Sequence, residues 1–460
     1  MSEPRSSGEN EARKSFFASL REFAKNAEKT AIVFHDRPHT YAGLIDEMAL
    51  WQRRFDESEV TAGAVVALEG GYSLNSCAAL LALIDRGAVL VPLGPLPDHK
   101  REEFLAVAEV ETVVRAEGDG TGHIEHTGAH ASHELFGRLR AASRPGLVLF
   151  SSGTTGSSKA SVLDFAKVLS RYSIATNPRR ILSFLSLDHI GGINTLLHTF
   201  SQGGTVVAVP ERTPDAVFAA IAEHGVQILP TTPTFLNMAL MSGAIERHDC
   251  TALTLVTYGT EPMPIQTLRR LTTALPGAHF KQTYGLSELG ILPTRSKSDD
   301  TLWLKLGGAG FDYKIVDDVL WVRSDMAMLG YLNASAPFDE EGYFNTQDVV
   351  QVDGEYLRIL GRRSEIINVG GEKVYPNEVE GVLLEADNVA DVTVSGLPSP
   401  VTGMVVKATV RLITAEDGKA VAIRVRKLCR EQLEAYKVPV VVEVSEAPQH
   451  SERFKKSRSV

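Results

Sequence analysis

The chain of 460 residues has few cysteines and no long apolar run. Cys77, Cys250 and Cys429 are odd in number and far apart, which argues against a disulfide framework or a cysteine metal cluster and favours a reducing compartment. No segment approaches the roughly eighteen apolar residues of a membrane-spanning helix. The polar segment 1–13 lacks the apolar core of a signal peptide. We therefore expect a cytoplasmic protein without a membrane span, whose first dozen residues are frayed.

An excess of basic charge is also missing. The chain has 47 lysines and arginines against 57 aspartates and glutamates, a formal net charge of -10. This balance argues against nucleic acid as the main partner. It leaves room for small anions, because a single pocket can be positive on an acidic protein.

Strand-like and helix-like segments alternate over the first 300 residues. Residues 64–68, 87–93 and 205–209 have the apolar pattern of buried strands, and residues 76–83 and 214–223 have the pattern of helices. Such alternation predicts parallel sheets covered by helices. After about residue 300 the strands become short and are separated by turns, which predicts a small barrel-like or antiparallel part.

A polar break at residues 361–364 predicts a domain boundary. A hairpin-like piece at 366–374 follows, and then a helix whose first residue is Pro376, where the missing N–H of proline is not needed. The predicted fold is α/β. A large N-terminal domain, residues 1–363, carries helix-covered parallel sheets and the barrel-like part. A small, mobile α+β domain, residues 364–460, follows it.

Hydroxyl groups crowd a segment between residues 151 and 159, directly after a strand-like apolar run. It consists of Ser151, Ser152, Gly153, Thr154, Thr155, Gly156, Ser157, Ser158 and Lys159. Glycines let a backbone approach an anion, hydroxyl and amide groups donate to phosphate oxygens, and lysine adds a positive charge. The segment predicts a polyphosphate site, most simply for ATP, although a polar surface turn has the same composition. Because Gly-Lys-Ser/Thr is missing, it is not a Walker loop.

A second polar segment follows the strand-like residues 278–283. It consists of Tyr284, Gly285, Leu286, Ser287 and Glu288. Glu288 could bind Mg2+ through one carboxylate, which this hard ion accepts together with water and phosphate oxygens. Tyr284 could lie over a base. Taken alone, the segment is better explained by a strand-to-loop turn with a surface glutamate.

Two further segments offer contacts to a nucleotide. Asp348 could accept hydrogen bonds from both ribose hydroxyls, and Arg362 could fork onto phosphate or ribose oxygens. Gly370 and Gly371 permit a turn with close ligand approach. Taken one at a time, these residues are better explained as a loop aspartate, an exposed arginine and an ordinary glycine hairpin turn.

The last basic stretch, residues 451–458, contains Lys455. By composition alone it is a solvated tail. A lysine on a small terminal domain could instead reach a carboxylate–phosphate reaction centre and neutralise charge that builds there.

In this order and at these spacings, the segments resemble the adenylate-forming superfamily: acyl- and aryl-CoA synthetases, adenylation domains of peptide synthetases, and luciferases. The resemblance covers nearly the whole chain. Residues 151–159 are similar to the family's phosphate loop, and residues 284–288 to its Tyr-Gly-x-Thr-Glu motif. Residues 346–348 match Thr-Gly-Asp with Gln347 in place of glycine. Residues 451–458 fit Thr-x-x-Gly-Lys-x-x-Arg, which puts Lys455 on the catalytic lysine.

The resemblance adds residues that composition does not single out. His189 falls in a segment similar to the family's acyl-pocket motif. Gly259, Thr260 and Glu261 resemble the segment that borders the adenine. Ser364 stands where the family has a hinge residue.

The resemblance implies a two-step reaction that uses ATP and Mg2+. A small carboxylic acid attacks the α-phosphate, giving an acyl-adenylate and pyrophosphate, and the acyl group then passes to a thiol. Lys455, Glu288 and His189 would be the catalytic residues, with Glu288 the Mg2+ ligand. Asp348 and Arg362 would hold the ribose. Rotation about Ser364 would then bring Gly370 and Gly371 against the incoming thiol.

The acid and the thiol remain open at this stage. CoA is favoured over the phosphopantetheine of a separate carrier protein, because residues 370–373 look more like those of CoA ligases. His189 favours an acyl or aryl acid, whereas Asp188 lies near where amino-acid-activating domains keep an aspartate. The remaining alternatives are a degenerate nucleotide-binding family member, kept open by Gln347 and Phe454, and a conventional P-loop NTPase.

Overall fold

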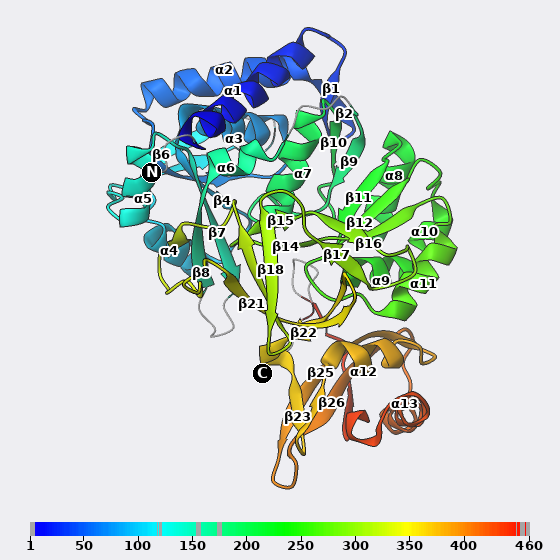
Figure 1. Cartoon of the computed structure of the whole chain (residues 1–460). Helices are drawn as coiled ribbons and strands as arrows, with labels where there is room; N and C mark the ends of the chain where they lie inside the picture. The colour runs from blue at the N-terminus through cyan, green and yellow to red at the C-terminus, as the bar shows by residue number, and fades with distance from the viewer. Residues whose placement is uncertain are drawn as a thin grey trace.

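The computed structural model describes residues 5–116, 118, 122–152, 158–172, 177–447, 449–450 and 456, with side chains from residue 11 on and only the backbone of Ser152. Figure 1 shows a large N-terminal domain above a smaller C-terminal domain, joined where β22 ends. This arrangement confirms the predicted α/β fold class.

One seven-stranded sheet carries the hydroxyl-rich segment. Its order is β20-β8-β7-β4-β3-β5-β6. The bounds are β3 (Val65–Glu69), β4 (Val89–Leu93), β5 (Thr112–Arg115), β6 (His123–His126), β7 (Gly146–Ser152), β8 (Ser158–Asp164) and β20 (Gly330–Tyr331). The central pairs β5–β3, β3–β4 and β4–β7 are parallel, and the outer pairs are antiparallel. Apolar residues without alternation fill the parallel strands because both faces are buried.

A second seven-stranded sheet has the order β13-β12-β11-β9-β10-β1-β2. Its strands are β1 (Thr30–Phe34), β2 (Arg37–Thr40), β9 (Arg180–Ser183), β10 (Thr205–Ala208), β11 (Ile228–Thr231), β12 (Leu255–Tyr258) and β13 (His279–Gln282). All pairs except β1–β2 are parallel. Ligands of such sheets bind outside the carboxyl ends of the strands. The segments that follow β9, β11, β12 and β13 are therefore the place to look for a site.

Helices cover both sheets, as the alternating pattern predicts. They are α1 (Arg5–Ala24), α2 (Tyr41–Glu57), α3 (Leu74–Arg86), α4 (Asp98–Val107), α5 (Glu134–Ala141), α6 (Phe165–Ser170), α7 (Ile190–Ser201), α8 (Pro214–His224), α9 (Pro233–Ser242), α10 (Ala244–Arg247) and α11 (Ile265–Ala274). The expectation of a frayed first dozen residues is wrong, because α1 already begins at Arg5. Phe16, Phe17 and Leu20 anchor α1 in the core. No helix in the described ranges is both long and apolar enough to cross a bilayer.

The strands after residue 283 form the predicted antiparallel part. A hairpin of β14 (Tyr284–Leu286) and β15 (Gly290–Leu292) is followed by a six-stranded sheet of order β16-β17-β22-β21-β19-β18. Its strands are β16 (Thr294–Ser296), β17 (Leu304–Leu306), β18 (Phe311–Val316), β19 (Val319–Ser324), β21 (Phe344–Asp353) and β22 (Tyr356–Arg362).

The C-terminal domain has its own core. It contains β23 (Ile367–Val369), β24 (Glu372–Val374), α12 (Pro376–Leu383), β25 (Val389–Ser399), β26 (Gly403–Leu412), α13 (Gly418–Gln432), the 3-10 turn η2 (Ala435–Lys437) and β27 (Val441–Val444). Buried valines of the sheet pack against α12 and α13. The 3-10 turn η1 (Arg363–Glu365) connects β22 to this domain. The boundary at residue 364 stays a prediction.

The two domains touch through a few polar contacts beside α9 and α12. The side-chain amide of Asn237 donates to the Ala390 carbonyl at 3.1 Å, and that of Asn377 donates to the Leu360 carbonyl at 3.3 Å. Sparse polar contacts of this kind are typical of domains that move relative to each other.

Candidate active site

Glu288 lies in the turn between β14 and β15, and its side chain is buried. The Tyr331 hydroxyl donates to Glu288 Oε1 at 2.7 Å, and the Ser151 hydroxyl lies 3.5 Å from the same oxygen. Among the described residues no donor reaches the other oxygen, Oε2. A buried carboxylate with one oxygen held by hydroxyls and one left open fits the single-carboxylate binding that Mg2+ accepts.

Tyr331 is a site residue that the motifs miss. It ends the short edge strand β20, which pairs with β8 beside the hydroxyl-rich segment. The ammonium group of Lys159 lies 5.4 Å from the centre of the Tyr331 ring. Burial raises the pKa of the Tyr331 hydroxyl, and the charge of Glu288 raises it further, so this hydroxyl stays protonated and donates. No local sequence pattern points to this tyrosine, because its partner Glu288 lies 43 positions earlier in the chain.

The hydroxyl-rich segment is the connection of the β7–β8 hairpin. Ser151 pairs with Lys159 in the ladder, so Lys159 lies on a strand and not in a free loop as expected. Asn333 holds the second strand: its carbonyl oxygen accepts from the Ala160 N–H at 3.1 Å, and its amide donates to the Ser158 carbonyl at 2.8 Å. Gly153, Thr154, Thr155 and Gly156 lie outside the described residues, as does the side chain of Ser152.

Asp348 and Arg362 face each other across two paired strands. Asp348 lies within β21, directly opposite Arg362 in β22, and not in a loop. The Tyr284 hydroxyl donates to Asp348 Oδ2 at 2.6 Å, and Arg362 Nε lies 3.5 Å from Asp348 Oδ1. Burial raises the pKa of the Asp348 carboxyl, and Arg362 and Tyr284 only partly oppose this shift. The Tyr284 hydroxyl therefore bonds to Asp348, the predicted ribose acceptor. Its place over a base stays a prediction.

Gln347 explains why glycine is usual at its position in the motif. Its φ is 62°, in the left-handed region that glycine adopts at no steric cost. The Asn345 side-chain oxygen accepts from the Gln347 N–H at 3.0 Å and supports this conformation. The backbone conformation is thus kept without glycine, and Asp348 still faces Arg362.

Gly259, Thr260 and Glu261 follow the carboxyl end of β12. A side chain at Gly259 would lie 2.5 Å from the Thr283 hydroxyl, so only glycine fits there. Glu261 Oε1 accepts from the Thr234 N–H at 2.7 Å. Burial raises the pKa of the Glu261 carboxyl, opposed by its hydrogen bond from Thr234.

His189 caps helix α7. Its Nδ1 accepts from the Gly191 N–H at 2.9 Å, so the neutral ring carries its proton on Nε2. His189 also lines a small pocket that is open to solvent. The other lining residues are Phe184, Leu185, Ser186, Arg212, Thr232 and Thr260. Since these follow the ends of β9, β10, β11 and β12, the pocket lies where a ligand of this sheet is expected.

The predicted catalytic lysine, Lys455, lies outside the described residues. Its neighbour Lys456 is described, and its backbone N–H donates to Glu261 Oε2 at 3.1 Å. Lys456 therefore contacts the N-terminal domain at one of the predicted nucleotide-binding residues.

Gly370 and Gly371 form the turn between β23 and β24, with φ of 60° and 96°. Two successive left-handed residues are the pattern of a tight hairpin turn. The Gly370 N–H donates to the Thr402 carbonyl at 2.9 Å. Figure 1 shows that this end of the domain points away from the N-terminal domain. The structure thus brings Glu288, Asp348, Arg362 and Glu261 to one side of the N-terminal domain, and it places the glycine turn elsewhere.

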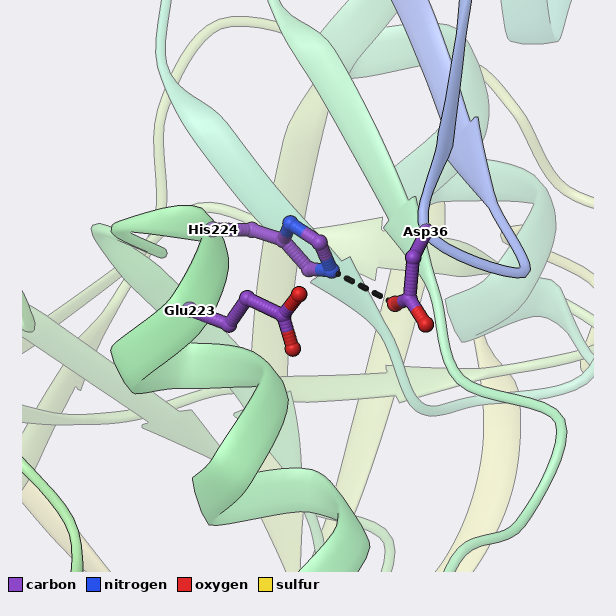
Figure 2. A group of neighbouring side chains, drawn as sticks. All are labelled: Asp36, Glu223 and His224. Atoms are coloured by element: carbon purple, nitrogen blue, oxygen red, sulfur yellow. Dashed lines mark hydrogen bonds and ion pairs between the residues drawn. The ribbon is translucent and has the colours of Figure 1, made fainter.

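A separate group of possible metal ligands lies at the β1–β2 turn and the last residues of α8. Figure 1 shows β1, β2 and α8 in its upper part, away from the C-terminal domain. Figure 2 shows Asp36, Glu223 and His224, with His224 Nε2 3.0 Å from Asp36 Oδ1. Asp36 and Glu223 are exposed. This group shares no residue with the site around Glu288.

The fold is that of a large N-terminal domain of helix-covered parallel sheets followed by a smaller C-terminal domain. Residues 20–332 match the AMP-binding enzyme family, and residues 378–455 match the AMP-binding enzyme C-terminal domain. The chain belongs to this family.

Relatives over most of the chain are CoA ligases. An indoleacetate–CoA ligase of Aromatoleum aromaticum is 29% identical, over 91% of this chain and 92% of the relative. A 2-succinylbenzoate–CoA ligase of Bacillus pumilus is 28% identical, over 90% of each. The fold is similar to that of an anthranilate CoA ligase in complex with anthranoyl-AMP, with a TM-score of 0.80, 19% identity, and coverage of 97% of this chain and 95% of that one.

Family and relatives together assign the activity. The chain is an AMP-forming acid–thiol ligase: it activates a small carboxylic acid with ATP as an acyl-adenylate, releases pyrophosphate, and transfers the acyl group to a thiol. ATP, Mg2+ and CoA are the cofactors of such ligases.

Proposed function

We propose that this chain is an aryl- or acyl-CoA ligase whose adenylation site lies between the β7–β8 hairpin, Glu288 and the Asp348–Arg362 pair. The observation that carries this proposal is the meeting of three distant segments. Ser151 lies at Glu288, and Asp348 lies at Arg362 and Tyr284. A phosphate-binding segment, a Mg2+ ligand and a ribose acceptor are the parts that adenylation of an acid requires.

The groups have separate tasks in the first step. The β7–β8 segment holds the outer phosphates, and Glu288 holds Mg2+, which would neutralise phosphate charge. Asp348 would accept hydrogen bonds from the ribose hydroxyls, and Arg362 favours the ionised form of that carboxylate, against the effect of burial. Lys455 would bridge the acid and the α-phosphate and stabilise the charge that develops as the pyrophosphate leaves.

The pocket beside His189 supports a small acid with an apolar body. Phe184 and Leu185 supply apolar surface, and His189 lines the same pocket. Asp188 does not line this pocket. The Ser186 hydroxyl donates to Asp188, and a side chain on Gly94 would approach the same carboxylate within 3.0 Å. Because Asp188 is not among the lining residues and its carboxylate accepts from Ser186, we favour an acyl or aryl acid over an amino acid.

The acceptor thiol of the second step is CoA. The relatives named above act on CoA, and the Gly370–Gly371 turn leaves backbone free of side chains for a pantetheine arm. The alternative is the phosphopantetheine of a separate carrier protein, which would use the same turn. Rotation of the C-terminal domain about Ser364, in the exposed η1 turn, would bring the turn to the site.

Acid-dependent exchange of labelled pyrophosphate into ATP tests the first step. We expect exchange with at least one of benzoate, anthranilate, indoleacetate and hexanoate, and thioester formation when CoA is added. A carrier protein that replaces CoA while free CoA is inert would move the acceptor to the alternative. Nucleotide binding without exchange for any acid would favour the degenerate nucleotide-binding member.

A further inference from the structure

Lys456, next to the proposed catalytic lysine, makes a buried charged cluster within the C-terminal domain. Its ammonium group donates to the Val392 carbonyl at 2.6 Å and lies 3.5 Å from both Glu380 Oε2 and Asp391 Oδ1. Only 9% of the Lys456 side chain and 1% of the Glu380 side chain are exposed. A lysine is buried this deeply only when it is paired.

The partners of Lys456 are themselves fixed. Glu380 lies on α12, and its Oε1 accepts from the Val394 N–H at 2.9 Å. Asp391 lies on β25, and its Oδ1 accepts from the Val392 N–H at 2.8 Å. The cluster therefore ties Lys456 to helix α12 and to the edge strand β25 of the C-terminal domain.

The backbone of the same residue reaches the other domain. The Lys456 N–H donates to Glu261 Oε2, while Glu261 Oε1 is held by the Thr234 N–H at the start of α9. Lys456 also forms an isolated antiparallel bridge with His450. Lys456 thus joins the two domains. Its side chain is bound within the C-terminal domain, and its backbone N–H donates to Glu261 on the nucleotide side of the N-terminal domain.

We propose that Lys456 is a positioning residue for adenylation. Its ammonium group is held by Glu380 and Asp391 of the C-terminal domain, and its backbone N–H by Glu261 of the N-terminal domain, so that Lys456 fixes how the C-terminal domain docks for the first step. This proposal rests on the proposed function, because it assigns Lys455 the catalytic task.

The alternative is that the cluster only stabilises the C-terminal domain. The chain offers a matched control in Lys437, which is also 9% exposed and lies 2.8 Å from both Glu378 and Glu434. This second lysine is paired within the same domain and has no contact with Glu261. Lys437→Met should therefore cost stability without changing how the C-terminal domain docks.

The experiment compares Lys456→Met, Lys456→Arg, Lys437→Met and the neutral triple variant Lys456→Met/Glu380→Gln/Asp391→Asn. In the triple variant, Gln and Asn keep the acceptor oxygens for the Val394 and Val392 amides and remove the unpaired charges. Each variant is measured for melting temperature and for kcat and KM(ATP) of pyrophosphate exchange, with the acid of the panel above that wild type uses fastest.

We expect Lys456→Met to lower kcat roughly 10- to 100-fold, because a misplacement of about 1 Å costs that much. KM(ATP) should not change, since Glu288 and Asp348 lie on the other domain. The triple variant should regain the melting temperature but not kcat, and Lys456→Arg should recover part of kcat. Lys437→Met should lower the melting temperature alone.

Two results would overturn the proposal. One is a Lys456→Met enzyme with kcat within twofold of wild type. The other is a triple variant that regains kcat together with its melting temperature, because the cluster would then act on stability only. Failure of wild type to exchange with any acid is a different result: it removes the proposed function, and the role of Lys456 with it.

Discussion

Replacing Asp348 by Asn changes the charge of the proposed ribose site while keeping its shape. The carboxylate lies in β21, only 7% exposed, with Tyr284 donating to one oxygen at 2.6 Å and Arg362 3.5 Å from the other. Asn retains one acceptor oxygen, to which the Tyr284 hydroxyl or one ribose hydroxyl can donate. It loses the second acceptor and the negative charge that Arg362 faces.

The size of the effect follows from the hydrogen bond that is lost. A hydrogen bond to a charged group contributes about 1.5–3 kcal/mol. At about 1.4 kcal/mol for each factor of ten, KM(ATP) should rise about 10- to 150-fold. The ribose is bound equally in the ground state and the transition state, so kcat should change much less.

Initial rates of pyrophosphate exchange with ATP and with 2′-deoxy-ATP measure this loss. Wild type should prefer ATP, because 2′-deoxy-ATP lacks one of the two ribose hydroxyls that donate to Asp348. The Asp348→Asn variant should lose most of that preference, since its second acceptor is gone. An unchanged KM(ATP), or a preference for ATP that persists in the variant, would refute the assignment of Asp348.

The pH dependence of KM(ATP) gives the same site a second test. Burial raises the pKa of Asp348 above its ordinary value, so the ionised form is disfavoured in the folded protein. As the pH falls through this raised pKa, the carboxylate is protonated and KM(ATP) should rise, at a higher pH than for an exposed aspartate. The Asp348→Asn variant should lack this rise. A rise of the same size in the variant would assign it to another group.

Three other changes have equally direct outcomes. Tyr331→Phe removes the hydroxyl that donates to Glu288, and loss of this hydrogen bond to a charged group should raise the Mg2+ concentration for half-maximal exchange about tenfold or more. An unchanged Mg2+ concentration for half-maximal exchange would argue against Glu288 as the metal ligand. Ser364→Pro fixes φ in η1 and should slow thioester formation more than exchange, whereas equal losses would count against a hinge there. Asp164→Ala removes the carboxylate that pairs with Arg144 at 2.5 Å and caps α6, so urea unfolding should show a loss of about 3–5 kcal/mol with KM(ATP) unaltered.

The order of the elements could be predicted because apolar periodicity records burial directly. The strand prediction at 205–209 and the helix prediction at 214–223 agree with β10 and α8 to within one residue. The start of α1 was missed because its first two turns are polar, and its helical state comes from the packing of Phe16 and Phe17 farther along. Tertiary packing commonly overrides local propensity in this way.

The site was predicted as a set of residues but not as a set of contacts. Asp348 looked like a loop residue because Gln347 breaks the strand pattern, whereas the structure absorbs Gln347 at a positive φ and continues β21. Tyr331 and Lys456 were missed for a different reason. Each acts through a partner more than 40 positions away, Glu288 for one and Glu380 and Glu261 for the other, and no local pattern records such a pairing.

Acid-dependent pyrophosphate exchange by wild type and Lys455→Ala, with nucleotide binding measured in parallel, tests the central claim most directly. We expect wild type to exchange label only when a suitable acid is present. Lys455→Ala should bind ATP as tightly as wild type, because Glu288, Asp348 and Arg362 remain, and should exchange far more slowly. A Lys455→Ala enzyme that exchanges like wild type would contradict the account of the reaction centre.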